Sequence, residues 1–286
     1  MKKNNFQLNF VCVGPQRTAS SWLDKALREH PLICLPGEVK ETYYFDKRYS
    51  RGLAWYAKFF NECEDEKYTV EVCSTYFESQ NALERIKEHN PEIKVIILVR
   101  NPIERSFSSF RHEYTKARVG LDFFQAVKKQ PRIIDSGRYA MIAPDWEDVF
   151  GKSNIFYLMQ EDINIDPQGQ IKAVCNFLGV EKFELPEELR SRYGQGGLPR
   201  FRWLAAVASS TASALRAAGL HKVAEAGKRL GLKQVYKGGN PATLSMTRKI
   251  FDYLLAEHEP DIAWLETRLQ RHFPHWRNPD QYGIYE

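Results

Sequence analysis

The fold of this chain is indicated by a stretch near its start, QLNFVCVGPQRTASSWLDKALREH, residues 7–30. The apolar run Gln7–Val13 is typical of a buried strand that ends at Gly14. The spacing of apolar residues over Ser20–His30 predicts a helix that Pro31 stops. A strand joined by a short loop to a helix is the repeating unit of parallel α/β sheets.

The rest of the chain repeats this unit. Further strands are predicted at Tyr68–Ser74, Lys94–Val99 and Asn154–Met159, and helices from Asn101-Pro102 onward, over Gln168–Leu178 before Gly179, and over Thr247–Phe273. The alternation predicts the α/β class, as a P-loop-type doubly wound parallel sheet flanked by helices. Nothing demands a second independent core, so residues 1–286 are expected to form a single domain with a basic helical insertion at about 199–236.

Positive charge is concentrated in one region of the chain. The net charge is +5, yet residues 190–249 contain twelve Lys and Arg side chains against Glu225 alone, so the remainder is net acidic. This asymmetry indicates an anionic substrate or polysaccharide, a membrane surface with a lipid-linked acceptor, or a nucleic acid. Nucleic acid is not expected, because no recognised reading motif accompanies the charge. A solvated helical face remains the alternative.

The cysteines and the apolar stretches indicate the compartment. Five scattered cysteines lack metal-ligand spacing and are expected to be free thiols in a reducing compartment: Cys12, Cys34, Cys63, Cys73 and Cys175. No apolar stretch approaches the roughly 20 residues that span a bilayer, and no signal-peptide pattern opens the sequence. We therefore expect a cytoplasmic protein.

The strand–helix junction at residues 14–23 is a candidate anion site. Free N–H groups and the helix dipole favour a phosphate there, Ser20 and Ser21 add hydroxyl donors, and Arg17 adds a positive charge. An ATP-binding loop that began at Gly14 would have Gly and Lys where Ala19 and Ser20 stand, which disfavours a magnesium triphosphate site. An ordinary capped turn remains the alternative.

A second candidate anion site follows a later strand, in VRNPIERSFSSF, residues 99–110. Arg100 stands at the carboxyl end of the strand Lys94–Val99, where ligands of open α/β sheets bind. Ser108 lies about two turns into the following helix, so an anion beside that helix could contact both side chains. Arginine forms strong, bidentate contacts with phosphate.

Together the two segments resemble the 5'-phosphosulfate loop and the 3'-phosphate motif of sulfotransferases that use 3'-phosphoadenosine-5'-phosphosulfate (PAPS). The strongest resemblance is to the heparan-type and bacterial carbohydrate enzymes, whose R-[ND]-P-x-x-R-x-x-S-x-[YF] signature is complete from Arg100 to Phe110. Four other segments resemble family motifs in order: Lys40–Asp46 (K-E-x-x-[FY]-F), Gly137–Tyr139 (G-x-Y), Tyr157–Asp162 (Y-E-D-L) and Asp261–Trp276 (L-E…W).

The resemblance implies a role for each matching residue. Those implied to bind PAPS are Arg17, Thr18, Ala19, Ser20, Ser21 and Trp22 around the 5'-phosphate, Arg100 and Ser108 at the 3'-phosphate, Tyr139, and Lys237 and Gly238 on the adenosine side. Arg17 would also stabilise charge on the leaving phosphate. Glu41 aligns with the general base of glycan-modifying members, and burial is expected to raise its pKa; a surface glutamate paired with Lys40 or Lys47 remains the alternative.

The chain departs from the family pattern in several places. Arg17 replaces a lysine, Ala19-Ser20-Ser21 replaces Gly-Thr-Thr, Gly239 replaces an arginine, and Val72 stands where glycan enzymes often have lysine.

The expected reaction is sulfuryl transfer from PAPS to a hydroxyl or amino acceptor, on a carbohydrate or another small or lipid-linked metabolite. A nucleotide kinase and a non-catalytic nucleotide-binding protein remain alternatives. No metal is expected, because His272 and His275 lack a nearby third ligand.

Overall fold

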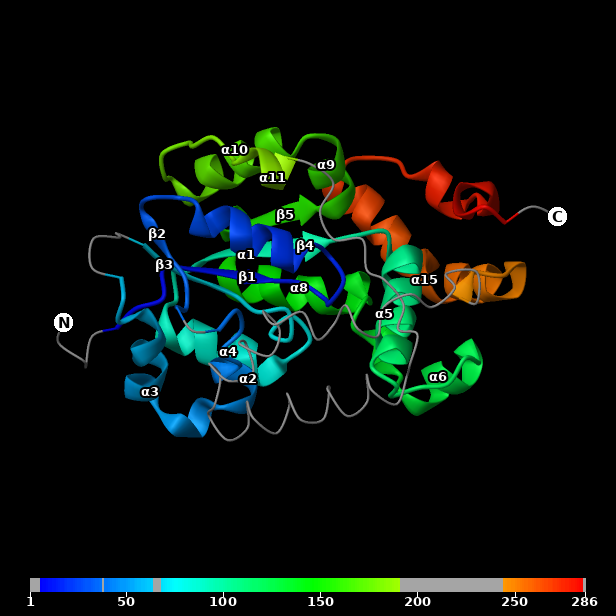
Figure 1. The fold of residues 1–286 in the computed structure, drawn as a ribbon, viewed down its shortest axis with the longest axis horizontal. Coiled ribbons are helices and arrows are strands. Elements are labelled where there is room, and N and C mark those ends of the chain that lie inside the picture. The colour runs from blue at the N-terminus through cyan, green and yellow to red at the C-terminus, as the bar shows by residue number, and fades with distance from the viewer. Residues whose placement is uncertain (1–5, 38, 64–67, 191–243, 285–286) are drawn as a thin grey trace. The chain divides into compact units, whose positions relative to one another are not determined.

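The computed structural model describes residues 6–37, 39–63, 68–190 and 244–284 (Figure 1). The described chain divides into two compact units. The first contains the described residues within 1–101, 138–194 and 267–270, and the second those within 102–137, 195–266 and 271–286. The basic insertion predicted at 199–236, with Lys237 and Gly238, lies outside the described residues. Two compact units can belong to one domain, so the single domain of 1–286 stays a prediction.

The first unit is built on a parallel sheet of five strands in the order β2-β3-β1-β4-β5. The strands are β1 (Phe10–Val13), β2 (Ile33–Cys34), β3 (Tyr68–Val72), β4 (Lys94–Val99) and β5 (Ile155–Met159). The four predicted strands are confirmed. β2 was not predicted, because two residues are too short to show a periodic pattern.

Helices cover both faces of this sheet, as the sequence predicted (Figure 1). They are α1 (Ser20–Arg28), α2 (Tyr44–Lys47), α3 (Leu53–Ala57), α4 (Gln80–His89), α8 (Tyr139–Phe150), α9 (Gln160–Ile165), α10 (Pro167–Leu178) and α11 (Glu187–Arg190). Phe10 and Cys12 of β1 pack in one buried cluster with residues of α1 and α10. Since side chains alternate along a strand, Val11 and Val13 face the side where α4 and α8 lie. No helix among the described residues is both long and apolar enough to cross a membrane.

The second unit is helical and is held together by a buried arginine. Its helices are α5 (Pro102–Thr115), α6 (Phe123–Lys129), α7 (Arg132–Asp135) and, up to Glu266, α15 (Arg248–Leu269). Arg105 of α5 is fully buried and donates to the Ser136 hydroxyl (2.7 Å) and to the Ile133 carbonyl. The neighbouring Ser106 hydroxyl lies 2.7 Å from Nε2 of His258 on α15. Buried polar contacts therefore join α5 to α7 and α15.

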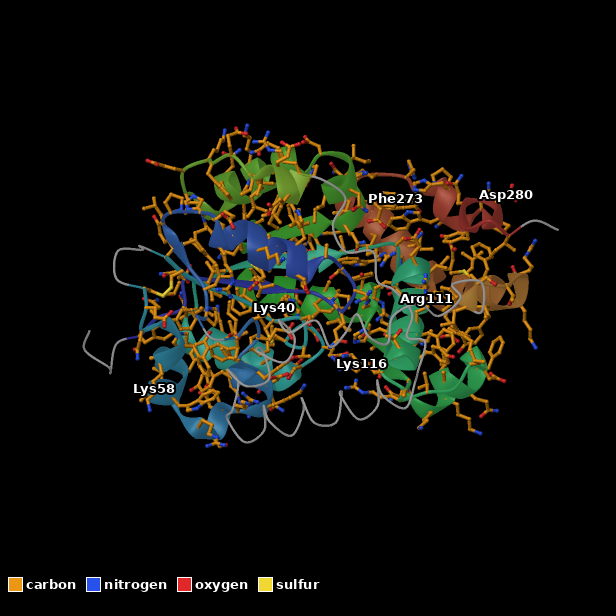
Figure 2. All side chains as sticks on the ribbon, in the orientation of Figure 1. Lys40, Lys58, Arg111, Lys116, Phe273 and Asp280 are labelled. Carbon is orange, nitrogen blue, oxygen red and sulfur yellow. A yellow bond between two sulfur atoms is a disulfide. The ribbon has the colours of Figure 1, made fainter. Side chains whose placement is uncertain are left out.

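The expectation of five free thiols is wrong for two of them. Cys34 and Cys63 form a disulfide with Cα atoms 5.8 Å apart (Figure 2), whereas the other three cysteines are free and buried. The chain after α3 returns beside β2, where the Gly37 N–H donates to the Phe59 carbonyl (2.8 Å). Disulfides are rare in reducing compartments, so the thiols no longer argue for a cytoplasmic location, which stays a prediction.

The β1–α1 loop, residues 14–19, has an unusual backbone. Gly14 has φ +134°, and a Cβ there would lie 2.5 Å from the Leu98 carbonyl oxygen of β4, so only glycine fits. Arg17 (φ 79°) and Ala19 (φ 67°) also have positive φ, although L-residues with a side chain disfavour this region. Ala19 occupies the position where the family pattern has glycine, and its left-handed backbone explains that preference.

We expect Ala19→Gly to stabilise the protein by about 0.5–1 kcal/mol, because glycine adopts the left-handed conformation without steric cost. Urea denaturation of both proteins measures the difference. Ala173→Gly, inside α10, is the matched control and should destabilise by a similar amount. A lower stability for Ala19→Gly would show that the left-handed backbone at this position is not strained.

Candidate active site

Part of the predicted site lies at the ends of three neighbouring strands: the loop with Arg17 follows β1, Arg100 follows β4, and Glu41 contacts the turn after β3. β1 pairs with β3 through Cys12 and Val72, and with β4 through Val13 and Ile97. The carboxyl ends of parallel strands meet at one edge of a sheet, and ligands bind where the strand order changes direction. The turns after β1, β3 and β4 therefore form the candidate active site.

The β1–α1 loop has the structure of an anion-binding turn. Ala19 is the N-cap of α1 in a left-handed conformation, and the helical residues begin at Ser20. A left-handed residue before a right-handed one turns successive N–H groups to one side, which makes an anion-binding nest. The N–H groups of Ser20 and Ser21 have no partner within the helix, and no acidic residue occupies the first turn. This turn can bind a phosphate group.

Two other residues of this segment have structural contacts. The Thr18 hydroxyl donates to the Pro15 carbonyl (2.7 Å) and closes the loop. The Trp22 N–H donates to the Ala19 carbonyl (2.9 Å), and its indole N–H donates to the Leu189 carbonyl (2.9 Å). Because the Trp22 N–H already has an acceptor, its predicted phosphate contact stays a prediction.

The structure brings Arg100 and Tyr139 to the β1–α1 loop. Arg100 Nη1 donates to the Arg17 carbonyl (3.2 Å), and the Arg100 N–H donates to the hydroxyl of the fully buried Tyr139 (3.1 Å). The Arg17 side chain is exposed. Tyr139 thus holds the backbone of Arg100 in place, and its direct contact with a nucleotide stays a prediction. Ser108 lies on α5 in the second unit, so its pairing with Arg100 also stays a prediction.

Glu41 is held by three donors. Its Oε1 accepts from the Ser74 N–H (3.1 Å) and the Ser74 hydroxyl (2.8 Å), in the turn after β3. Its Oε2 accepts from the Tyr43 hydroxyl (2.6 Å), and Lys40 Nζ lies 3.7 Å from Oε1. The Glu41 side chain is 13% exposed, which does not fit an ordinary surface glutamate.

The pKa of Glu41 moves in the direction opposite to the one expected. Burial acts to raise this pKa, but the positive charge of Lys40 and the donors from Tyr43 and Ser74 outweigh burial and lower it. The sequence-based expectation of a raised pKa is therefore wrong, because it considered burial without the donors that accompany it. Glu41 is consequently a carboxylate at neutral pH, able to accept a proton.

Lys40, which Figure 2 labels, is a site residue that sequence reasoning missed. Its ammonium donates to the Ser20 hydroxyl (2.9 Å) and lies 3.7 Å from Glu41. Lys40 therefore connects the anion-binding turn with the buried carboxylate. Its place beside Glu41 in the K-E motif was the available signal, but only the fold shows that it reaches Ser20.

Glu71 of β3 is a second residue that sequence reasoning missed. It is fully buried, and its Oε1 accepts from the Thr42 N–H (2.8 Å) and hydroxyl (2.7 Å). Its Oε2 accepts from the Tyr56 (2.8 Å) and Tyr76 (3.0 Å) hydroxyls. Burial raises the pKa of Glu71 to about 6, against the lowering effect of these four hydrogen bonds. A charged residue inside an apolar strand was the signal for this role.

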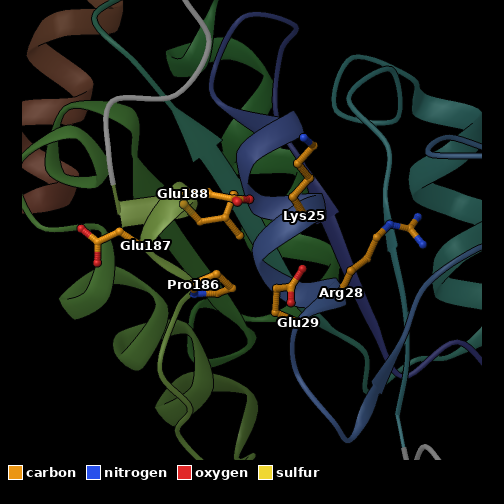
Figure 3. A pocket seen from close by; sticks show the side chains of 7 residues that line it. Lys25, Arg28, Glu29, Pro186, Glu187 and Glu188 are labelled. Atoms are coloured by element: carbon orange, nitrogen blue, oxygen red, sulfur yellow. The ribbon is translucent and has the colours of Figure 1, made fainter. Parts of the chain in front are cut away.

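A surface hollow of about 450 Å³ lies elsewhere on α1 (Figure 3). Lys25 and Arg28, in the carboxyl-terminal half of α1, and the following Glu29 line it together with residues 186–189. It lies away from the Ser20 end of the helix, and its lining mixes both signs of charge. We therefore assign the site to the strand ends and not to this hollow.

No group of three or more His, Cys, Asp or Glu side chains that could hold a metal ion occurs within the described ranges. His272 and His275 are both exposed.

The raised pKa of Glu71 predicts a pH dependence of stability. The native state binds more protons than the unfolded state between pH 4.5 and about 6, so the contribution of Glu71 is present below pH 4.5 and is lost as the pH rises to 6. We expect this loss to be about 2 kcal/mol. Chemical denaturation of wild type and Glu71→Gln from pH 4 to 7 measures this loss. The other groups titrate in both proteins, so the pH dependence of the difference in unfolding free energy comes from Glu71. A stability difference that does not change with pH would contradict the shift.

Comparison with known proteins identifies the family. The family described as "Sulfotransferase domain" matches residues 9–193. Heparan sulfate glucosamine 3-O-sulfotransferase 6 of Mus musculus is 31% identical over 181 residues, which is 60% of this chain and 52% of that protein. Membrane-associated sulfotransferase kil1 of Dictyostelium discoideum is 33% identical over 105 residues, 36% of this chain and 22% of that protein.

A solved structure shares the fold. A sulfotransferase from Alicyclobacillus acidocaldarius superposes with a TM-score of 0.68 at 21% identity, covering 96% of this chain and 100% of that chain. The chain spans about half the length of the first curated relatives. The match over residues 9–193 includes the β1–α1 loop, Glu41 and Arg100, and on this evidence the chain belongs to the sulfotransferase domain family.

Proposed function

We propose that this protein transfers a sulfuryl group from PAPS to a hydroxyl or amino acceptor. The observation that supports this most is the link from Ser20 in the anion-binding turn through Lys40 to the ionised Glu41. A phosphate bound at that turn and an acceptor hydroxyl bound at Glu41 would lie on either side of Lys40. Sulfuryl transfer needs this arrangement of donor and acceptor.

Several residues would divide the binding of PAPS between them. The N–H groups and hydroxyls of Ser20 and Ser21 hold the 5'-phosphate, and Arg17 stabilises the charge that develops on it. Arg100, with its backbone held by Tyr139, binds the 3'-phosphate together with Ser108. The remaining proposed contacts are Thr18, Ala19 and Trp22 in the loop and Lys237 and Gly238 on the adenosine side.

The reaction is an in-line displacement. The acceptor oxygen attacks sulfur while Glu41 takes its proton, and the bond from sulfur to the bridging oxygen breaks toward the 5'-phosphate. The products are the sulfated acceptor and adenosine 3',5'-bisphosphate. Positioning and charge stabilisation dominate such transfers. The lowered pKa keeps Glu41 ionised and ready at neutral pH, and no metal is assigned to the step.

We propose a glycan or lipid-linked metabolite as the acceptor. The name of the mouse relative, a heparan sulfate glucosamine sulfotransferase, supports a carbohydrate. The positive charge of residues 190–249 supports contact with an anionic acceptor or a membrane surface. Nucleic acid is not proposed as a partner, and a cytoplasmic location remains our proposal.

Transfer of labelled sulfate from PAPS to a panel of acceptors tests this function. Tight binding of adenosine 3',5'-bisphosphate without transfer to any acceptor would favour a non-catalytic nucleotide-binding protein. Ala19 and Arg17, which depart from the family pattern in the loop, are the reason to consider this alternative. Stabilisation by magnesium ATP, but not by adenosine 3',5'-bisphosphate, would favour a kinase.

Arg100→Ala should weaken the binding of adenosine 3',5'-bisphosphate by about 10- to 100-fold, because a phosphate loses its charge-assisted partner. Isothermal titration calorimetry measures the affinity. Arg248→Ala, which removes an exposed arginine paired with Asp252, is the control and should leave it unchanged. Equal affinity in Arg100→Ala would reject the 3'-phosphate site.

Glu41→Gln should lower the turnover number by roughly 10²–10⁴-fold, because the amide keeps the shape of the side chain but accepts no proton. Nucleotide affinity should stay within a factor of about three of wild type, since Glu41 acts on the acceptor and not on the phosphates. Steady-state kinetics and calorimetry together make the comparison. A near-normal rate would remove Glu41 as the base.

A further inference from the structure

The β1–α1 loop has no lysine of its own. No lysine occurs in residues 14–23, where the cation is Arg17, whose side chain is exposed. Lys40 comes from a separate segment, and its ammonium donates to the hydroxyl of Ser20, the first residue of α1 (2.9 Å). The loop therefore receives an ammonium group from another part of the fold.

Described residues on both sides of Lys40 have hydrogen bonds to other segments. Before it, Arg28 of α1 donates to the carbonyls of Pro36 (2.9 Å) and Val39 (3.5 Å). After it, the buried Glu71 accepts from the N–H and the hydroxyl of Thr42. The Lys40 side chain is 30% exposed. A lysine between these contacts, with a partly covered side chain, is suited to a defined contact.

We propose that Lys40 is a catalytic residue that contacts the sulfuryl group during its transfer, an inference that rests on the proposed sulfuryl transfer. Its ammonium lies between Ser20, which would hold the 5'-phosphate, and Glu41, which would receive the acceptor proton. The sulfur must pass between those two groups. A cation in contact with both therefore lies beside the path of the transferring group.

The chemistry of an ammonium suits this position. Lysine has three donors on a compact head, of which one binds the Ser20 hydroxyl, while Glu41 forms an ion pair with the ammonium at 3.7 Å. As the acceptor oxygen bonds to sulfur, the bond to the bridging oxygen breaks and its electron pair stays on the 5'-phosphate. The acceptor proton neutralises Glu41 in the same step. Lys40 then loses its anionic partner while the sulfuryl oxygens carry negative charge in the transition state, and its charge stabilises those oxygens.

Lys40→Met tests the proposal, because methionine keeps most of the side-chain length and removes the charge. Lys40→Arg keeps the charge on a larger, planar head. Lys172→Met is the matched control, since Lys172 of α10 forms a surface ion pair with Glu184 (2.7 Å). Thermal denaturation confirms that each variant folds.

Binding gives the first measurement, and it does not depend on turnover. PAPS contains the sulfuryl group and adenosine 3',5'-bisphosphate lacks it, so Lys40→Met should weaken PAPS at least tenfold more than the bisphosphate. Calorimetry measures both affinities. A non-hydrolysable PAPS analogue replaces PAPS if the wild type consumes PAPS during the titration. Equal weakening of the two ligands would overturn the proposal, because Lys40 would then only support Ser20.

Single-turnover rates at saturating PAPS give the second measurement. We expect Lys40→Met to be slower by roughly 10²–10³-fold, as when one donor to a developing negative charge is removed, with a smaller loss in Lys40→Arg. A rate within threefold of wild type would overturn the proposal.

The double variant Lys40→Met/Glu41→Gln separates two roles of Lys40. If Lys40 only keeps Glu41 ionised, the double variant should be as slow as Glu41→Gln alone, and the proposal is wrong. If Lys40 acts on the sulfuryl group, the double variant should be slower than either single variant. Absence of transfer by the wild type to every acceptor would reject the proposed function, and the comparison of the two nucleotide affinities would still decide the role of Lys40.

Discussion

β1 forms hydrogen bonds with β3 on one side and with β4 on the other, and both pairs are parallel. Parallel pairing places three carboxyl ends at one edge of the sheet, so the turns that follow them must share the same space. The close approach of β4 leaves no room for a side chain at Gly14. The chain then turns through left-handed residues into α1, whose first N–H groups have no partner within the helix.

Two buried carboxylates beside this edge have opposite properties. Glu41 has three donors and a neighbouring ammonium, and these lower its pKa despite burial. Glu71 has four donors and is fully buried, and burial raises its pKa to about 6. Divergent environments of this kind separate the roles of two acids. The ionised Glu41 is suited to proton transfer, whereas Glu71 holds the segment that carries Lys40 and Glu41.

The loop combines strain with charge supplied from elsewhere. Ala19 occupies a left-handed conformation that glycine would adopt more easily, and Arg17 stands where the family pattern has lysine. The ammonium that reaches the first helical serine belongs to Lys40. The site therefore depends on the segment after β2 as much as on the loop after β1, and the fold joins them through Arg28 and Glu71.

The sequence by itself determined the strand–loop–helix units and identified residues 14–23, Glu41 and Arg100 as candidate site residues, because periodicity and short motifs are local. Only the tertiary structure decided that Lys40 contacts Ser20, that Glu71 holds Thr42, that Cys34 pairs with Cys63, and that the pKa of Glu41 falls. These contacts join segments whose proximity depends on strand order. A pKa depends on every donor and charge around the group, and no local pattern of residues specifies them.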